Sequence, residues 1–180
     1  MTVKAHQFPL AAADIGALMN EQTAIVTAMN GIPYWYFHGV DSPWRGRVLQ
    51  SVDPGAILTR AIPPERAIGC VLYPWAEIVA PGIVDQSTSN RFILGEPDGS
   101  KTARIAALSE IMKAGGLDAP VARDIRSELW GKLWGNLSMN PLSALTGATI
   151  DRLARGLFRT HVCRRAQNHA GAGGRHGEGG

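Results

Sequence analysis

Residues 128–147 read ELWGKLWGNLSMNPLSALTG, and the rest of the chain is best understood from this stretch outward. Its apolar residues recur at the i, i+3, i+4, i+7 spacing of a helix with one apolar face, namely Trp130, Leu133, Trp134 and Leu137. On another face, Lys132, Asn136 and Asn140 stand four residues apart, so their side chains should stack one above another. The stretch therefore predicts a helix that carries one cation and two amides in a line.

The composition of this helix does not favour stability. Gly131 and Gly135 form a third strip without side chains, and each glycine costs about 1 kcal/mol relative to alanine in a helix interior. Pro141 has no backbone N–H to donate, so we expect a kink or break just after Asn140. A helix that accepts these costs is a candidate for a functional element.

A plainer interpretation of the same residues stays open. Glu128 precedes Lys132 by four residues, which is a favourable ion-pair spacing on a solvated helix face. The two asparagines would then be residues that flank a helix end. The alignment of the amides with Lys132, beside glycines and a proline, favours a site over this alternative.

Length and composition exclude several classes of protein. The chain has 180 residues, 45% of them hydrophobic and 18% charged, as in an ordinary soluble globular protein. It shows no apolar run of about 18 residues and no apolar core of a signal peptide near its start. Cys70 and Cys163 are too few and too far apart for a disulfide framework or a metal site. We therefore expect a protein of the reducing cytoplasm, without a metal and without a membrane partner.

The charge distribution argues against a nucleic-acid partner. The net charge is +3, but residues 155–180 alone hold five arginines and one glutamate, a balance of +4, so the preceding residues sum to −1. The excess of positive charge thus belongs to a Gly-rich tail, residues 159–180, that we expect to be disordered. Nucleic-acid binding through this tail is the weakest of the functions considered.

The N-terminal part of the chain predicts a parallel sheet. Residues 1–4 suggest a short strand, residues 11–20 a helix, and residues 23–31 a buried strand that ends in the turn pair Asn30-Gly31. Strand–helix–strand order with fully apolar strands is typical of parallel sheets, whose ligands lie outside the carboxyl ends of the strands. The polar residues at these ends are Lys4, Gln7 and Asn30. Taken alone, Asn30 is better explained as a turn former.

Further along, a short helix and a Pro-Pro break precede a strand at residues 67–73, and residues 77–86 and 90–96 suggest a hairpin-like continuation of the sheet. The turn-rich residues 96–100 mark a domain border. A helix over residues 100–116 follows, with Ser100 as its N-cap and Gly115-Gly116 as its end. Its inward residues should be Ile105, Leu108, Ile111 and Met112.

Four segments resemble the ketopantoate reductase (2-dehydropantoate 2-reductase) family, in the family's order. They are VKAHQ at 3–7, TAMNGIP at 27–33, RFILGEPDG at 91–99 and KLWGNLSMNPLSALTG at 132–147, the last being the most specific. The resemblance covers about residues 1–157. It implies an α/β fold, with a partial Rossmann-like parallel-sheet domain followed by part of an all-α C-terminal domain. The expected borders are 1–97 for the NADP-binding domain and 98–158 for the helical substrate domain.

The resemblance also implies an activity and a site. Family members are oxidoreductases that reduce ketopantoate to pantoate with NADPH, for pantothenate and coenzyme A synthesis. Carried over by position, Lys132 matches the catalytic lysine, and Asn136 and Asn140 match amides that contact the substrate. Asn30 matches an asparagine at the junction of cofactor and substrate. Lys4 and Gln7 match residues near the nicotinamide cofactor.

This chain also departs from the family pattern. It contains no Gly-rich phosphate loop after a strand, and its Arg- and Gly-rich tail stands where the family's helical domain continues. We therefore expect a member truncated at both ends. The alternatives are a non-catalytic fragment of such a reductase or a reductase of a related 2-oxo acid. A small-molecule 2-oxo acid is the expected partner, and a homodimer is left open.

Overall fold

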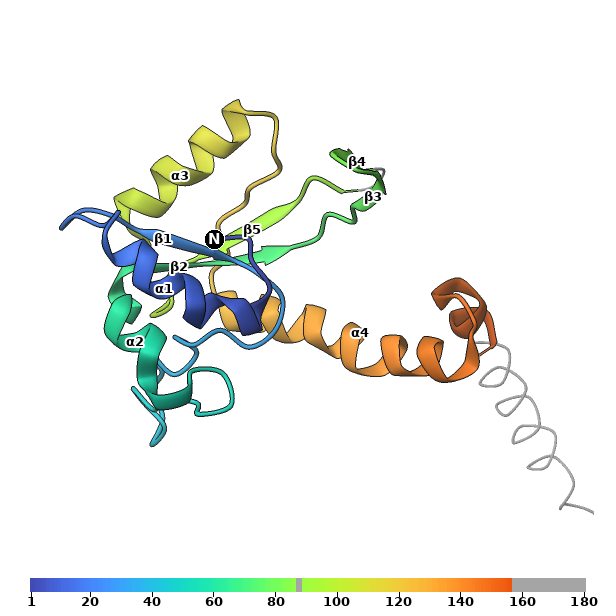
Figure 1. The fold of residues 1–180 in the computed structure, drawn as a ribbon, viewed down its shortest axis with the longest axis horizontal. Helices are drawn as coiled ribbons and strands as arrows, with labels where there is room; N and C mark the ends of the chain where they lie inside the picture. The colour runs from blue at the N-terminus through green and yellow to red at the C-terminus, as the bar shows by residue number, and fades with distance from the viewer. Residues whose placement is uncertain (87–88, 157–180) are drawn as a thin grey trace, which may run out of the picture. The chain divides into compact units, whose positions relative to one another are not determined.

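The computed structural model describes residues 1–86 and 89–156, and Figure 1 shows its ribbon. The tail predicted to be disordered, residues 159–180, lies outside the described residues. The elements are η1 (Ala5–Gln7), α1 (Phe8–Gly16), β1 (Ile25–Ala28), η2 (Pro54–Ala56), α2 (Ile57–Ala61), η3 (Pro64–Arg66), β2 (Ala67–Leu72), β3 (Glu77–Ala80), β4 (Ile83–Asp85), β5 (Phe92–Gly95), α3 (Ala103–Ala114) and α4 (Ile125–Thr146). Residues 150–156 are helical as well.

The chain divides into two compact units, Met1–Lys132 and a second unit that begins at Leu133, so the border falls inside α4. The first unit holds the larger sheet and the helices that cover it. The second holds the later turns of α4. The domain border predicted at residues 97/98 stays a prediction.

The larger sheet has the strand order β1-β2-β5. β1 and β2 are parallel, with Ile25 opposite Ala67, whereas β5 runs antiparallel to β2, with Gly95 opposite Gly69. Five of the six residues of β2 are buried, which is typical of a strand covered on both faces. The α/β fold with a parallel-containing sheet, as the sequence predicts, is confirmed.

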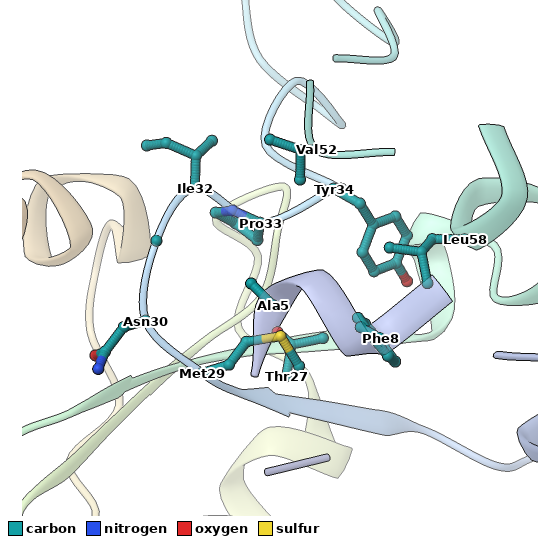
Figure 2. A pocket seen from close by; sticks show the side chains of 11 residues that line it. Ala5, Phe8, Thr27, Met29, Asn30, Ile32, Pro33, Tyr34, Val52 and Leu58 are labelled. Atoms are coloured by element: carbon teal, nitrogen blue, oxygen red, sulfur yellow. The ribbon is translucent and has the colours of Figure 1, made fainter. Parts of the chain in front are cut away.

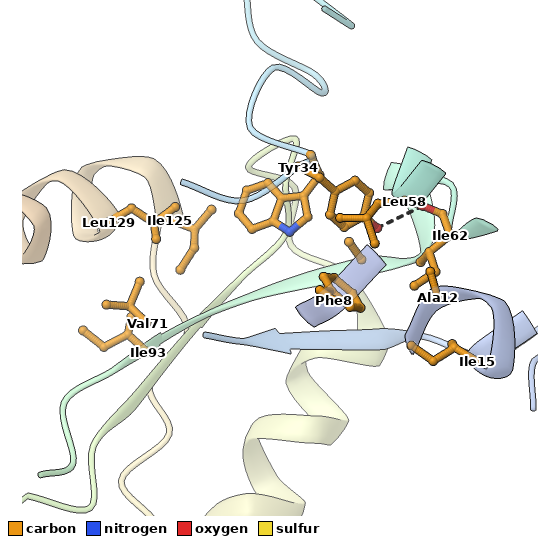
Figure 3. Packing of buried hydrophobic residues seen from close by; sticks show 12 residues of the cluster. Phe8, Ala12, Ile15, Tyr34, Leu58, Ile62, Val71, Ile93, Ile125 and Leu129 are labelled. Atoms are coloured by element: carbon orange, nitrogen blue, oxygen red, sulfur yellow. Dashed lines mark hydrogen bonds between the residues drawn. The ribbon is translucent and has the colours of Figure 1, made fainter. Parts of the chain in front are cut away.

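Alternate residues of β2 face two separate cores, because successive side chains of a strand point to opposite faces. Ala67 and Val71 pack with α1, α2 and the start of α4, and the side chains of this cluster are drawn in Figure 3. Ile68 and Cys70 pack on the other face with Ile105 of α3. Figure 1 shows α3 on one side of the sheet and α1 and α2 on the other. The sheet is thus the middle layer of three.

Two glycines open a space in the sheet for α4. At Gly95, a Cβ would stand 2.4 Å from Cβ of Ile125, and at the opposite Gly69 a Cβ would stand 2.8 Å from both Ile125 and Trp35. Neither glycine has a positive φ, so the requirement is space and not backbone conformation. The first turn of α4 therefore sits directly on the backbone of β2 and β5.

The residues predicted to form a hairpin split between two sheets. β3 and β4 pair with each other as an antiparallel hairpin, while β5 joins the larger sheet beside β2. The hairpin exposes its apolar side chains, including Ile78, Val79, Ile83 and Val84.

The strand predicted at residues 1–4 is wrong. Only Met1 lies along β1: its amine donates to the carbonyl of Val26 at 2.7 Å, and its carbonyl accepts from the amide of Ala28 at 3.0 Å. The chain then turns into η1 at Ala5, so too few residues remain for a strand.

The helix of residues 100–116 is confirmed, with corrections. Its N-cap is Thr102, not Ser100, and the Thr102 side chain accepts from the amide of Ile105. Ser100 instead belongs to a turn in which its amide donates to Asp98 at 2.9 Å. Ile111, predicted to point inward, is 70% exposed, because α3 packs on the sheet along Ile105.

Of the kink or break predicted just after Asn140, the break is wrong, since α4 continues through Pro141 to Thr146. The kink stays a prediction. Proline removes one N–H bond, but the helix on either side keeps its own bonds. The helix ends instead before Gly147, whose φ of 65° is a backbone conformation that favours glycine.

The apolar face predicted for α4 is not the face that the first unit buries. Ile125 and Leu129, four residues apart, are buried against the sheet. Trp130, Trp134 and Leu137 are 47%, 76% and 63% exposed. Among the described residues, no helix is both long and apolar enough to cross a bilayer.

Candidate active site

The candidate site lies at the carboxyl ends of the two parallel strands. β1 ends at Ala28, and the chain turns two residues later at Asn30-Gly31, where Gly31 has a φ of 101°. β2 ends at Leu72 and is followed by Tyr73. Because the strands are parallel and adjacent, the carboxyl ends of β1 and β2 lie side by side at one edge of the sheet.

Lys132 of α4 reaches this edge. Its Nζ donates to Oδ1 of Asn30 at 2.6 Å and also to the backbone carbonyl of Leu72. It also lies 5.6 Å from the ring centroid of Tyr73, within the range of a cation–π contact. The structure thus brings together Lys132 and Asn30, which are 102 residues apart in the sequence.

The surroundings of Lys132 change its acidity. Partial burial disfavours the charged ammonium and lowers the pKa of Lys132 below its usual range, with Cys70 opposing this effect more weakly. An ammonium carries three N–H groups, and two of them already have acceptors among the described residues. One N–H remains for an oxygen of a ligand.

A small recess opens beside Asn30. Its walls come from η1, α1, β1, α2 and the loop after β1, and include Ala5, Met29, Ile32 and Pro33 (Figure 2). Asn30 lies at its rim, so the amide belongs both to this apolar recess and to the contact with Lys132.

The other predicted residues are placed less directly. Lys4 directly precedes Ala5 of the recess, Gln7 stands two residues after it, and both are exposed. In the described structure no hydrogen bond joins either side chain to Asn30 or Lys132. Asn136 and Asn140 belong to the second unit, where Nδ2 of Asn140 donates to Oδ1 of Asn136 at 3.4 Å. Their roles stay predictions.

Sequence reasoning missed Tyr73 and the Leu72 carbonyl. The rule that selected Asn30, namely a position just past the carboxyl end of a strand, applies equally to Tyr73 after β2. It also missed Arg126, whose guanidinium has acceptors on a different loop. No motif marks that residue in the sequence.

The fold and the site together define a Rossmann-like α/β domain with a lysine and an amide at the ligand-binding edge of its sheet. No protein-family model matches the chain. It is 48% identical over 165 residues to the 2-dehydropantoate 2-reductase of Mesorhizobium japonicum, a match that covers 89% of this chain and 51% of the relative. The resemblance predicted from the sequence is thereby confirmed.

Solved structures agree. A candidate ketopantoate reductase from Ralstonia solanacearum superimposes with a TM-score of 0.79 at 41% identity, covering 84% of this chain and 47% of that one. The 2-dehydropantoate 2-reductase from Geobacter metallireducens gives 0.64 at 26% identity, covering 81% and 42%. The chain therefore spans about half the length of the relatives it matches.

Proposed function

We propose that this chain carries the lysine–amide part of a 2-dehydropantoate 2-reductase, which reduces ketopantoate to pantoate with NADPH on the route to pantothenate. The observation that carries the proposal is the contact between Lys132 and Asn30 at the carboxyl ends of β1 and β2. The names of the relatives supply the substrate and the reaction. A reducing cytoplasm, in which the buried thiol of Cys70 stays reduced, is part of this proposal.

Lys132 supplies the acid that a ketone reduction needs. As the C2 carbonyl becomes an alkoxide, negative charge develops on its oxygen, and a positioned ammonium stabilises that charge and then donates a proton. Because the pKa of Lys132 is lowered, it lies closer to the operating pH, which makes the ammonium a better proton donor. The bond to Asn30 and the Leu72 carbonyl holds the ammonium in place before substrate arrives.

In this proposal the residues around Asn30 would contact one end of a nicotinamide cofactor. The recess at the Asn30 turn is only about 20 Å³, too small to enclose a ring, but its apolar lining beside the Lys132–Asn30 contact would form a wall against which a flat ring lies. Ala5, Met29 and Asn30 would hold that end, with Lys4 and Gln7 nearby in sequence. When bound, NADPH would supply the hydride.

The amides of α4 would hold the substrate. Asn136 and Asn140 are able both to donate and to accept, which suits the hydroxyl and carboxylate groups of a 2-oxo acid. Their hydrogen bond at 3.4 Å is long, so exchanging it for a ligand bond loses little.

The test of this proposal is the ketopantoate-dependent loss of NADPH absorbance with the purified chain. We expect oxidation of NADPH that requires ketopantoate and yields pantoate in equal amounts. A second series with other 2-oxo acids decides the substrate, because a related reductase would give its highest kcat/KM with one of those. Absence of oxidation with every 2-oxo acid, by a chain that is folded by circular dichroism, would instead support the non-catalytic fragment.

A further inference from the structure

Arg126 ties the first turn of α4 to the loop that follows the Asn30 turn. Its Nε donates to the carbonyl of Tyr36 at 2.8 Å, and its Nη2 donates to the carbonyl of His38. Its guanidinium also lies 5.8 Å from the Tyr36 ring centroid. The side chain is half-buried, and its two acceptors are backbone groups, so the contact depends on the fork geometry of an arginine.

Trp130, one turn further along α4, makes a second tie to the same loop. Its indole N–H donates to the hydroxyl of Tyr36 at 2.6 Å. Arg126 and Trp130 are four residues apart, so both project from the same side of the helix. Tyr36 thus receives contacts from both residues, through its carbonyl, its ring and its hydroxyl.

The loop is firm enough to transmit these ties to Asn30. Its turns are closed by backbone bonds from Tyr36 to Pro33 at 3.1 Å and from His38 to Trp35 at 2.8 Å. Trp35 is buried and donates to Oγ1 of Thr27 in β1 at 3.0 Å. In the sequence, Asn30 lies between Thr27 and Trp35, which this hydrogen bond joins. Lys132 lies two residues after Trp130 on α4.

From this geometry we propose that Arg126 and Trp130 are positioning residues that hold the Lys132 ammonium against Asn30 by clamping α4 onto the loop of residues 33–38. The effect of this clamp on catalysis rests on the proposed function. The clamp itself is a property of the described structure. Both residues act through Lys132, because among the described residues their side-chain hydrogen bonds go to Tyr36 and His38 and not to Asn30.

The clamp has a readout that does not depend on catalysis. The burial that lowers the pKa of Lys132 exists only while α4 is held on the sheet edge. The groups in contact with Lys132 are the Leu72 carbonyl, Tyr73 and Asn30. Cys70, which packs on the other face of the sheet, acts on Lys132 only electrostatically, and Glu128 lies one turn earlier on the same helix. Loosening the clamp hydrates the ammonium and moves its pKa upward, toward the ordinary value of about 10.4.

The experiment is a titration of the lysine side chains by carbon NMR in the full chain. The sequence has four lysines, Lys4, Lys101, Lys113 and Lys132, so the Lys132 signal is assigned as the one lost in Lys132→Arg. We expect the Lys132 pKa to be the lowest of the four, and to rise in Arg126→Lys and in Trp130→Phe. An Arg→Lys variant adds a fifth lysine signal, which is recognised as the one absent from the original chain. Arg123→Lys, an exposed change three residues before Arg126, should leave it unchanged.

The outcomes separate the clamp from general stability and from the proposed function. A Lys132 pKa that stays at the original value in both folded variants would overturn the clamp. Loss of the fold in both variants, with Arg123→Lys folded, would also overturn it, because the ties would then be structural only. If the proposed function fails, the pKa result still stands. If the clamp and the proposed reductase activity are both correct, kcat/KM should fall about tenfold or more in Arg126→Lys, mainly through a lower kcat.

Discussion

The chemistry at Lys132 depends on three neighbours that come from different parts of the chain. The Asn30 amide and the Leu72 carbonyl accept from its ammonium, and the Tyr73 ring lies beside it. All three favour the charged form, yet burial still lowers the pKa of Lys132. The residue is therefore a stronger acid than a lysine in water.

The pH dependence of the reaction follows from this. The ammonium is the active form, so kcat/KM should fall as pH rises through the lowered pKa of Lys132. The fall should begin below the range of an ordinary lysine, about 10.4. Steady-state rates across the alkaline range measure this, and a profile that stays level up to that value would contradict the assignment.

Asn30 should act mainly by orienting Lys132. Asn30→Ala removes the 2.6 Å bond and should lower kcat/KM by about 10-fold to 100-fold, since a group displaced by about 1 Å loses this much. Asn90→Ala, a change to another exposed asparagine outside the site, is the control. An Asn30→Ala variant with unchanged kcat/KM would show that the turn is only structural.

At the scale of the elements, the contact of the first turn of α4 with β2 and β5 determines where Lys132 lies. Gly69 and Gly95 make room for Ile125, and the sequence alone gives no sign of this, because both glycines stand in strands with ordinary φ values. The helices and the parallel strands were predictable, since each has a periodic or fully apolar pattern. The burial of Ile125 and Leu129 instead of Trp130 and Trp134 was not, because both stripes have helical spacing and only tertiary packing selects one.

A side chain added at Gly95, where Ile125 packs on the strand, should destabilise the first unit. Gly95→Ala would place a Cβ 2.4 Å from Ile125, and overpacking of this kind costs about 1–3 kcal/mol. Gly16→Ala, where no atom lies within 4 Å, should cost far less. Urea unfolding of the two variants compares them directly, and equal midpoints would mean that α4 does not rest on this strand.

The N-terminus of α4 should show an acid-dependent contribution to stability. Asp124 accepts from the amide of Arg126 at 3.0 Å and from the hydroxyl of Ser127 at 2.7 Å, and the Ser127 bond is the main cause of its lowered pKa. Removal of such a cap in Asp124→Ala costs about 1 kcal/mol. A carboxyl with a lowered folded-state pKa stabilises above the ordinary value of about 3.9 and loses this effect as pH falls through the folded-state value.

Thermal unfolding at a series of pH values tests this sign. The Tm difference between the original chain and Asp124→Ala should be constant near neutral pH and shrink in acid. A difference that grows on acidification would contradict the assignment of Asp124 as an ionised cap.

At the scale of the whole molecule, the chain corresponds to only part of the length of its relatives. It matches about half of their length, and its described residues include the lysine–amide contact and an apolar recess. Lys132 and Asn30 could be selected from sequence because the motif around Lys132 is specific and because Asn30 follows an apolar, β-branched run that predicts a strand. Their contact could not be derived, since it depends on the packing of α4 across 102 residues of chain.

The most direct test of the account is kcat/KM for ketopantoate in Lys132→Ala, compared with Lys113→Ala. Lys113 is exposed and pairs with Glu110 on α3, so its removal should leave the rate unchanged. Loss of the proton donor in Lys132→Ala should lower kcat/KM by about 10²–10⁴-fold while NADPH binding and Tm stay close to the original. Equal rates in the two variants would contradict the central claim that Lys132 is the acid of this site.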